Sequence, residues 1–180
     1  MVAAVLFVLA GILNLLIAPP QRVFNSFSDY LIEVILVVAF ALTLVAIAGL
    51  HTLHLQSGRY GRLGAAGSFV TFIGYALIVL VAAASILIGG EALFGVRLLG
   101  ALAVLIGSIL LRAITLRARV VPWWCGVLLI VGFPLGDVVD TAIGEGSEVM
   151  VLGILWGLVG YALLSSSRAP NRRSVRVSSV

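Results

Sequence analysis

The chain has 180 residues, of which 62% are hydrophobic and 10% charged, and its mean hydropathy is +1.26. A soluble domain has about 45–50% apolar and about 25% charged residues, so this chain has too few polar side chains to cover a water-facing surface. Its formal net charge of +4 does not indicate nucleic-acid binding, because the arginines are scattered over short connections and a tail without a recognisable binding module. The single cysteine, Cys125, excludes an internal disulfide.

The apolar runs are continuous rather than alternating, which favours helical membrane spans over a β-barrel. The sequence therefore predicts an all-α, polytopic transmembrane helical bundle that forms one domain, residues 1–166. The basic tail, residues 167–180, is expected to be disordered and cytoplasmic. The six predicted spans are residues 2–18, 30–50, 68–90, 93–111, 122–136 and 149–164.

The first of these spans has a cleaved signal peptide as its alternative. Residues 2–18 would be roughly 26 Å long at ~1.5 Å rise per residue, close to the ~30 Å hydrocarbon core. The segment lacks a basic N-terminal region, and Pro19 and Pro20 stand where a cleavage site needs small residues. We expect a retained span.

A polar and basic stretch, residues 51–67 (HTLHLQSGRYGRLGAAG), separates the second and third spans. With six spans, nine of the eleven arginines lie on the same side of the membrane as this stretch, and only Arg22 and Arg97 lie opposite. All seven carboxylates fall on that opposite side. The positive-inside rule then predicts that both termini are cytoplasmic and that the acidic rim faces outward.

Pro134 is expected to bend the fifth span near its end, because proline removes a helical hydrogen bond. The tetrapeptide Gly-Tyr-Ala-Leu occurs at residues 74–77 in the third span and at residues 160–163 in the sixth. This recurrence would suit two inverted three-helix halves, as in many transporters. Four matching residues in so apolar a chain also arise by chance.

Two charged residues, Glu33 and Arg97, are predicted to lie inside spans, each about one turn from the outer surface. Polar groups in a bilayer are costly and therefore mark candidate sites. The two side chains could face the bundle interior as an ion pair or a substrate-contacting pair. Alternatively, both could extend to the outer interface, which their shallow depth allows.

Asp137 and Asp140 are spaced three apart and would share one face of a helix. With the nearby Glu145 and Glu148 they could form an outward acidic mouth for cations or a divalent-ion site. The alternative is an ordinary solvated loop.

His51 and His54 share a helix face at the cytoplasmic end of the second span, and Cys125 enters the fifth span from the same side. These three are weak candidates for a soft metal, because a structural zinc site needs four ligands. No metal or other cofactor is expected.

Two glycine pairs have the spacing that lets membrane helices approach closely, Gly132 with Gly136 and Gly153 with Gly157. They predict tight packing of the fifth and sixth spans, or dimerisation through the second pair.

The motifs GRYGRLGAAG (58–67) and GYALL (160–164) resemble those of small multi-spanning bacterial membrane proteins of unknown function. That resemblance implies a bacterial plasma membrane but no activity and no site residue. One functional hypothesis is a small transporter or channel-like protein with Glu33, Arg97, Asp137 and Asp140 lining an outer vestibule. The alternative is a non-catalytic component that assembles with itself or another membrane protein through small-residue helix faces. No enzyme is expected, because the sequence contains no known catalytic signature.

Overall fold

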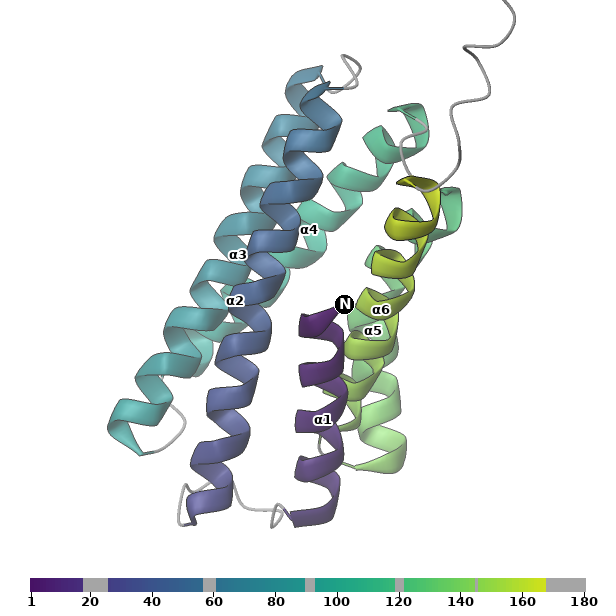
Figure 1. The fold of residues 1–180 in the computed structure, drawn as a ribbon. Coiled ribbons are helices and arrows are strands. Elements are labelled where there is room, and N and C mark those ends of the chain that lie inside the picture. The colour runs from purple at the N-terminus through teal and green to yellow at the C-terminus, as the bar shows by residue number, and fades with distance from the viewer. Residues whose placement is uncertain (18–25, 57–60, 90–92, 119–121, 145, 168–180) are drawn as a thin grey trace, which may run out of the picture.

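The computed structural model describes residues 1–17, 26–56, 61–89, 93–118, 122–144 and 146–167. A few side chains within these ranges, including those of His54 and Asp137, lie outside the description. Six α-helices occupy the described ranges (Figure 1): α1 (Val2–Ile17), α2 (Phe27–Gln56), α3 (Gly61–Ile88), α4 (Phe94–Ala118), α5 (Trp123–Ile143) and α6 (Ser147–Ser167).

The helices form a closed ring in chain order. Each helix packs mainly against the helix before it and the helix after it, and α6 packs back against α1. Short connections make successive helices antiparallel neighbours, as in up-and-down bundles. The predicted all-α helical bundle is confirmed.

Four helices contain a stretch long and apolar enough to cross a membrane: Phe27–Leu53, Gly61–Ile88, Phe94–Leu111 and Ser147–Ser165. The two halves of α5, Trp123–Gly132 and Pro134–Ile143, add a fifth if together they form one bent span. Helix α1, which corresponds to the predicted span 2–18, has only 16 residues, fewer than the roughly 17–25 that a span usually needs. The structure thus supports a multi-pass membrane protein with four to five candidate spans, and a sixth span stays a prediction.

The kink predicted at Pro134 is present. The segments on either side of Phe133 meet at an angle of 52°. Proline has no N–H to donate, and its ring clashes with the carbonyl four residues earlier, so the helix bends there.

Several helices, but not α1, extend beyond at least one end of their predicted spans. Helix α2 continues to Gln56 and α3 begins at Gly61, so most of the polar stretch 51–67 is helical rather than a loop. Helix α5 likewise continues through Ile143, into the region predicted as an acidic loop. The hydrocarbon boundary limits where apolar residues are needed, but it does not oblige a helix to end there.

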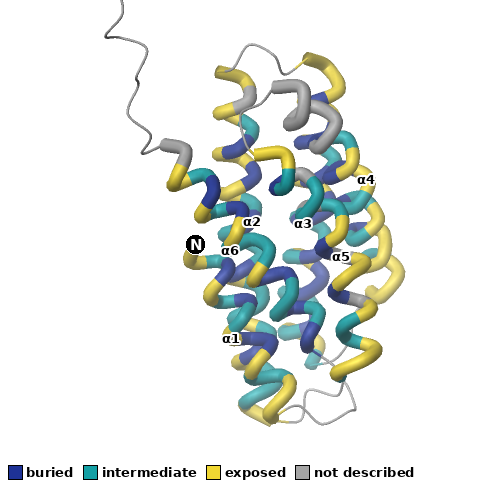
Figure 2. The backbone as a smooth tube through the Cα atoms, turned by 90° about the vertical axis from the view of Figure 1, so that its right-hand side faces the viewer, coloured by how far each residue is buried: buried dark blue, intermediate teal, exposed yellow. Residues whose placement is uncertain are grey.

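Apolar side chains cover much of the outer surface of the bundle, where Figure 2 shows exposed positions along the helices. Leu87, for example, is 87% exposed and Leu80 is 65% exposed. A continuous apolar surface of this kind is unfavourable in water but matches lipid tails. The outer faces of the helices are therefore suited to contact with the bilayer.

The described side chains form three buried clusters, and the indole of Trp156 packs against all of them. The first cluster surrounds Cys125, the second surrounds Phe7, and the third surrounds Tyr75 and Val104. Trp156 on α6 is thus the common contact of the core.

Candidate functional site

Glu33 and Arg97 line one small pocket between α2, α3 and α4. Glu33 is half-buried and Arg97 is exposed. The cavity has a volume of about 30 Å³, room for one or two water molecules. We call it the outer pocket, after the side of the membrane that the sequence predicts for Glu33 and Arg97; its other lining residues are Leu36, Phe40, Ile78, Val81, Ala82, Ser85 and Phe94. The two charged residues, which were predicted to lie in different spans, therefore line the same pocket.

Aromatic side chains fill the interior beyond the outer pocket. The ring of Phe40, which lines the pocket, lies edge-on to Phe7 with 4.8 Å between ring centroids. Phe40 also lies 6.1 Å from Tyr75, and Tyr75 lies 6.3 Å from Trp156. The Trp156 Nε1–H donates a 3.3 Å hydrogen bond to the Tyr75 hydroxyl. We call Phe7, Phe40, Tyr75 and Trp156 the aromatic core.

A second cavity lies on the other side of the aromatic core. It has a volume of about 20 Å³ and is lined by Tyr75, Ser108 and Trp156, together with apolar residues of α5 and α6. It shares no lining residue with the outer pocket. Phe40 of the aromatic core lines the outer pocket, and Tyr75 and Trp156 line the second cavity, so the aromatic core lies between the two.

Asp140 lies apart from the outer pocket and organises the connection between α5 and α6. Its Oδ1 accepts a hydrogen bond from the Gly146 N–H at 2.9 Å and contacts the Glu148 N–H and the Ser147 hydroxyl at 3.4 and 3.5 Å. A carboxylate at the start of α6 also complements the helix dipole. Asp140 therefore acts as a cap in this structure, and the side chain of Asp137 lies outside the described residues.

The three weak metal candidates do not come together among the described side chains. Cys125 is 1% exposed and packs in an apolar cluster with Leu50, Leu111 and Val159. His51 lines a different cavity, described below, and the His54 side chain lies outside the description. No group of three or more His, Cys, Asp or Glu residues with metal-binding geometry occurs in the part of the chain that the structure describes.

The two predicted glycine pairs face different helices. A Cβ at Gly132 would lie 2.8 Å from Leu155 Cδ1, and one at Gly136 would lie 3.3 Å from Glu148 Cβ, so this pair packs against α6. At Gly153 a Cβ would lie 2.8 Å from both the Ala4 carbonyl oxygen and the Val8 nitrogen of α1. Within one copy of the chain, Gly153 is therefore already covered by α1.

The most extensive helix contact among the described residues, between α3 and α4, was not anticipated from the sequence. A Cβ at Gly74 would lie 2.7 Å from the Gly100 carbonyl oxygen, and one at Gly107 would lie 2.9 Å from the Gly67 carbonyl oxygen. These four glycines form two pairs, each spaced seven residues apart, and so repeat on one face every two turns. A search for seven-residue spacing would have found this glycine seam.

The repeated Gly-Tyr-Ala-Leu segments have different environments. Tyr75 is 2% exposed at the centre of the bundle, whereas Tyr161 is 65% exposed on its surface. Gly74 contacts the backbone of α4, whereas Gly160 lies near Met1. The two segments therefore do not play equivalent parts in the fold.

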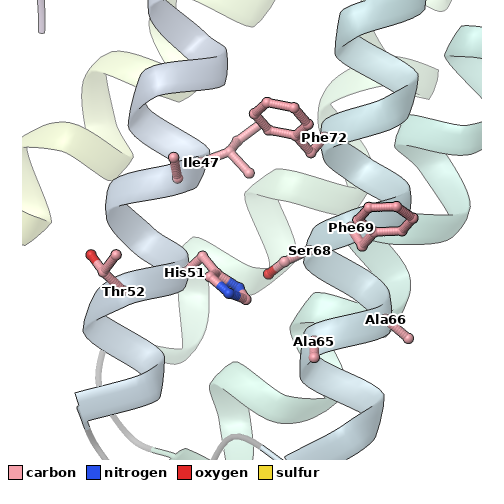
Figure 3. A pocket seen from close by; sticks show the side chains of 9 residues that line it. Ile47, His51, Thr52, Ala65, Ala66, Ser68, Phe69 and Phe72 are labelled. Atoms are coloured by element: carbon pink, nitrogen blue, oxygen red, sulfur yellow. The ribbon is translucent and has the colours of Figure 1, made fainter.

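A larger cavity opens between α2 and α3 near the end of α2 (Figure 3). Its volume is about 590 Å³, within the roughly 300–1,000 Å³ of ligand sites. In Figure 3 the His51 imidazole and the Ser68 hydroxyl point toward one another across the space between the two helices. We call this cavity the α2–α3 groove; it is lined by Ile47, Ala48, His51, Thr52, Ala65, Ala66, Ser68, Phe69 and Phe72.

No protein-family model matches this chain, and no curated protein or solved structure is significantly similar to it. These comparisons therefore do not assign the chain to any family, and they do not test its resemblance to small bacterial membrane proteins. The structure supports its coarser part, a small polytopic membrane protein.

Proposed function

We propose that this protein is a non-catalytic integral membrane component that acts by binding other membrane proteins or further copies of itself, rather than by conducting a solute. The observation that carries this proposal is the aromatic core, which fills the interior between the outer pocket and the second cavity. A transport path needs space that water or substrate can enter, and cavities of about 30 and 20 Å³ are too small for anything larger than a few water molecules.

The proposal includes a membrane arrangement with six spans, both termini in the cytoplasm and a bacterial plasma membrane as the location. The one-sided distribution of nine arginines supports this orientation. The short helix α1 packs against both α2 and α6 and so closes the ring of helices. These contacts support counting α1 as part of the bundle.

Binding would use the outer surface of the bundle, because most of the glycines already pack against a neighbouring helix of the same chain. Gly49 in α2 is an exception, since a Cβ at this position would meet no atom within 4 Å. An exposed small residue of this kind allows a second helix to approach closely. If this face mediates self-association, Gly49→Leu will shift the protein toward the monomer in detergent, whereas Val5→Leu, at an exposed position of α1 without an open glycine, will not.

A small transporter remains the second candidate, because Glu33 and Arg97 line one pocket. An acid and a base at a shared pocket could bind a zwitterionic or charged solute at the outer surface. A flux assay separates the two functions. The purified chain in liposomes should pass rubidium, chloride and protons no faster than protein-free liposomes. Flux that is abolished in both Glu33→Gln and Arg97→Gln would favour transport instead.

A further inference from the structure

The α2–α3 groove has a polarity gradient along its length. His51, Thr52 and Ser68 provide polar groups in the part of the groove nearer Gln56 and Gly61, where Ala65 and Ala66 also lie, while Ile47 and Phe72 lie further into the bundle. Phe69 and Phe72 are 66% and 41% exposed, so aromatic surface is available along the cavity. A groove that is polar at one end and apolar along the rest matches a molecule with a polar head and an apolar chain.

The polar end of the groove also carries positive charge. Arg62 is exposed and precedes Ala65 and Ala66 by three and four residues, which places it on the same face of α3 as the groove. Helix α3 has no acidic residue in its first turn, so Arg62 adds to the positive end of the helix dipole rather than balancing it. This end of the groove is therefore complementary to an anion.

The groove lies at the end of the bundle opposite the outer pocket. His51 follows Glu33 by eighteen residues along α2, roughly 27 Å at ~1.5 Å per residue. In the orientation proposed above, the polar end of the groove reaches the headgroup region of the cytoplasmic leaflet. Anionic phospholipids are concentrated in that leaflet and attract basic side chains near the surface.

We propose that the α2–α3 groove binds one anionic glycerophospholipid. The phosphate lies beside Arg62 and His51, next to Ala66, and an acyl chain extends from there along Ala48, Phe69 and Phe72. A partner helix fits the groove less well, because the polar and positively charged groups of the groove are confined to one end. The site rests on the membrane orientation proposed above but not on the role of the outer pocket, since it uses neither Glu33 nor Arg97.

The test uses the full chain in phosphatidylcholine nanodiscs doped with either of two photoreactive lipids. One is phosphatidylglycerol with a diazirine on its acyl chain, and the other is phosphatidylcholine with the same chain. Mass spectrometry should locate the phosphatidylglycerol adducts on the segments 47–52 and 65–72. Arg62→Gln should lower the preference for phosphatidylglycerol by about fivefold, the usual effect of one basic residue near a lipid headgroup, whereas Arg97→Gln should leave it unchanged.

A second pair of variants tests the apolar part. Ala48→Phe should reduce labelling of the groove roughly tenfold, because an aromatic ring would occupy the space of the acyl chain. Ala46→Phe is the matched control, since Ala46 is also exposed on α2 but does not line the groove. Arg62→Gln keeps the shape of the groove and so remains informative if Ala48→Phe does not fold.

Equal labelling by the two lipids, or labelling that persists in folded Ala48→Phe, would overturn the proposal. A photoreactive amino acid placed at Ala66 identifies the occupant directly. Adducts with lipid support the site, and adducts between two protein chains would show that a second copy occupies the groove instead. The flux assay reads the opposite end of the bundle, so the two proposals can fail separately.

Discussion

The Trp156 indole N–H donates a hydrogen bond to the buried Tyr75 hydroxyl, joining α6 to α3 across 81 positions of sequence. Trp156 also contacts all three buried clusters. The hydrogen bond therefore connects α6 to α3 through the centre of the bundle. Interhelical hydrogen bonds in membranes contribute about 0.6 kcal/mol on average and up to ~1.7 kcal/mol.

A double-mutant cycle of Trp156→Phe and Tyr75→Phe should therefore give a coupling energy of about 1 kcal/mol. The measurement is the free energy of unfolding by SDS in mixed micelles. Tyr161→Phe, which removes an exposed hydroxyl, serves as the control and should change stability little. Strictly additive effects of the two core substitutions would show that the bond is not made.

Gly74→Ala should destabilise the protein by about 1–3 kcal/mol, because the added methyl group would meet the Gly100 carbonyl oxygen and the Val104 nitrogen at 2.7 Å. Backbone atoms cannot move aside as a flexible side chain can. Gly95→Ala, where a Cβ meets nothing within 4 Å, should be neutral or stabilising by up to ~1 kcal/mol. Equal stability of the two variants would contradict the close approach of α3 and α4.

Asp140→Ala should cost about 0.5–2 kcal/mol, the usual effect of removing a helix-capping side chain. The reason is that Oδ1 accepts the Gly146 N–H and lies near two further donors at the start of α6. Asp140→Asn keeps an oxygen at this position and should cost less. Thermal denaturation of the detergent-solubilised variants compares their stabilities. A lower stability of Asp140→Asn than of Asp140→Ala would refute a capping role.

Cys125 should react with a maleimide only after unfolding, because its side chain is 1% exposed and surrounded by Leu50, Leu111 and Val159. Labelling of the folded protein in detergent should therefore be slow, and labelling in SDS should be fast and complete. A single cysteine introduced at the exposed Leu87, in a Cys125→Ser background, provides the positive control. Rapid labelling of Cys125 in the folded state would mean that the packing around α5 is looser than described.

The helical segments and the bend of α5 could be predicted from the sequence because they depend on local features. Continuous apolar runs force the backbone to bond within its own segment, and Pro134 disrupts a helix wherever it stands inside one. The ends of the helices were less predictable. Residues such as His51 and Ile143 lie beyond the apolar limits assigned to the spans but still continue the helix.

The candidate site was only partly accessible from the sequence. Glu33 and Arg97 were conspicuous as charges in apolar runs, yet their shared pocket depends on how α2 and α4 flank α3. Asp140 looked like part of an acidic surface, but its role as a cap depends on the tight turn between α5 and α6. The α2–α3 groove arises from the space between two helices, which no single stretch of residues encodes.

Water is expected to enter the outer pocket but not to pass the aromatic core, and substituted-cysteine accessibility tests this most directly. In a Cys125→Ser background, single cysteines are placed at Glu33, Phe40 and Tyr75 of the full chain in liposomes, and a small membrane-impermeant thiol reagent is added. We predict rapid reaction at Glu33→Cys, slower reaction at Phe40→Cys, because this half-buried position lines the pocket, and none at the buried Tyr75→Cys. Rapid reaction at Tyr75→Cys would reveal an aqueous path through the aromatic core and contradict the proposed closed interior.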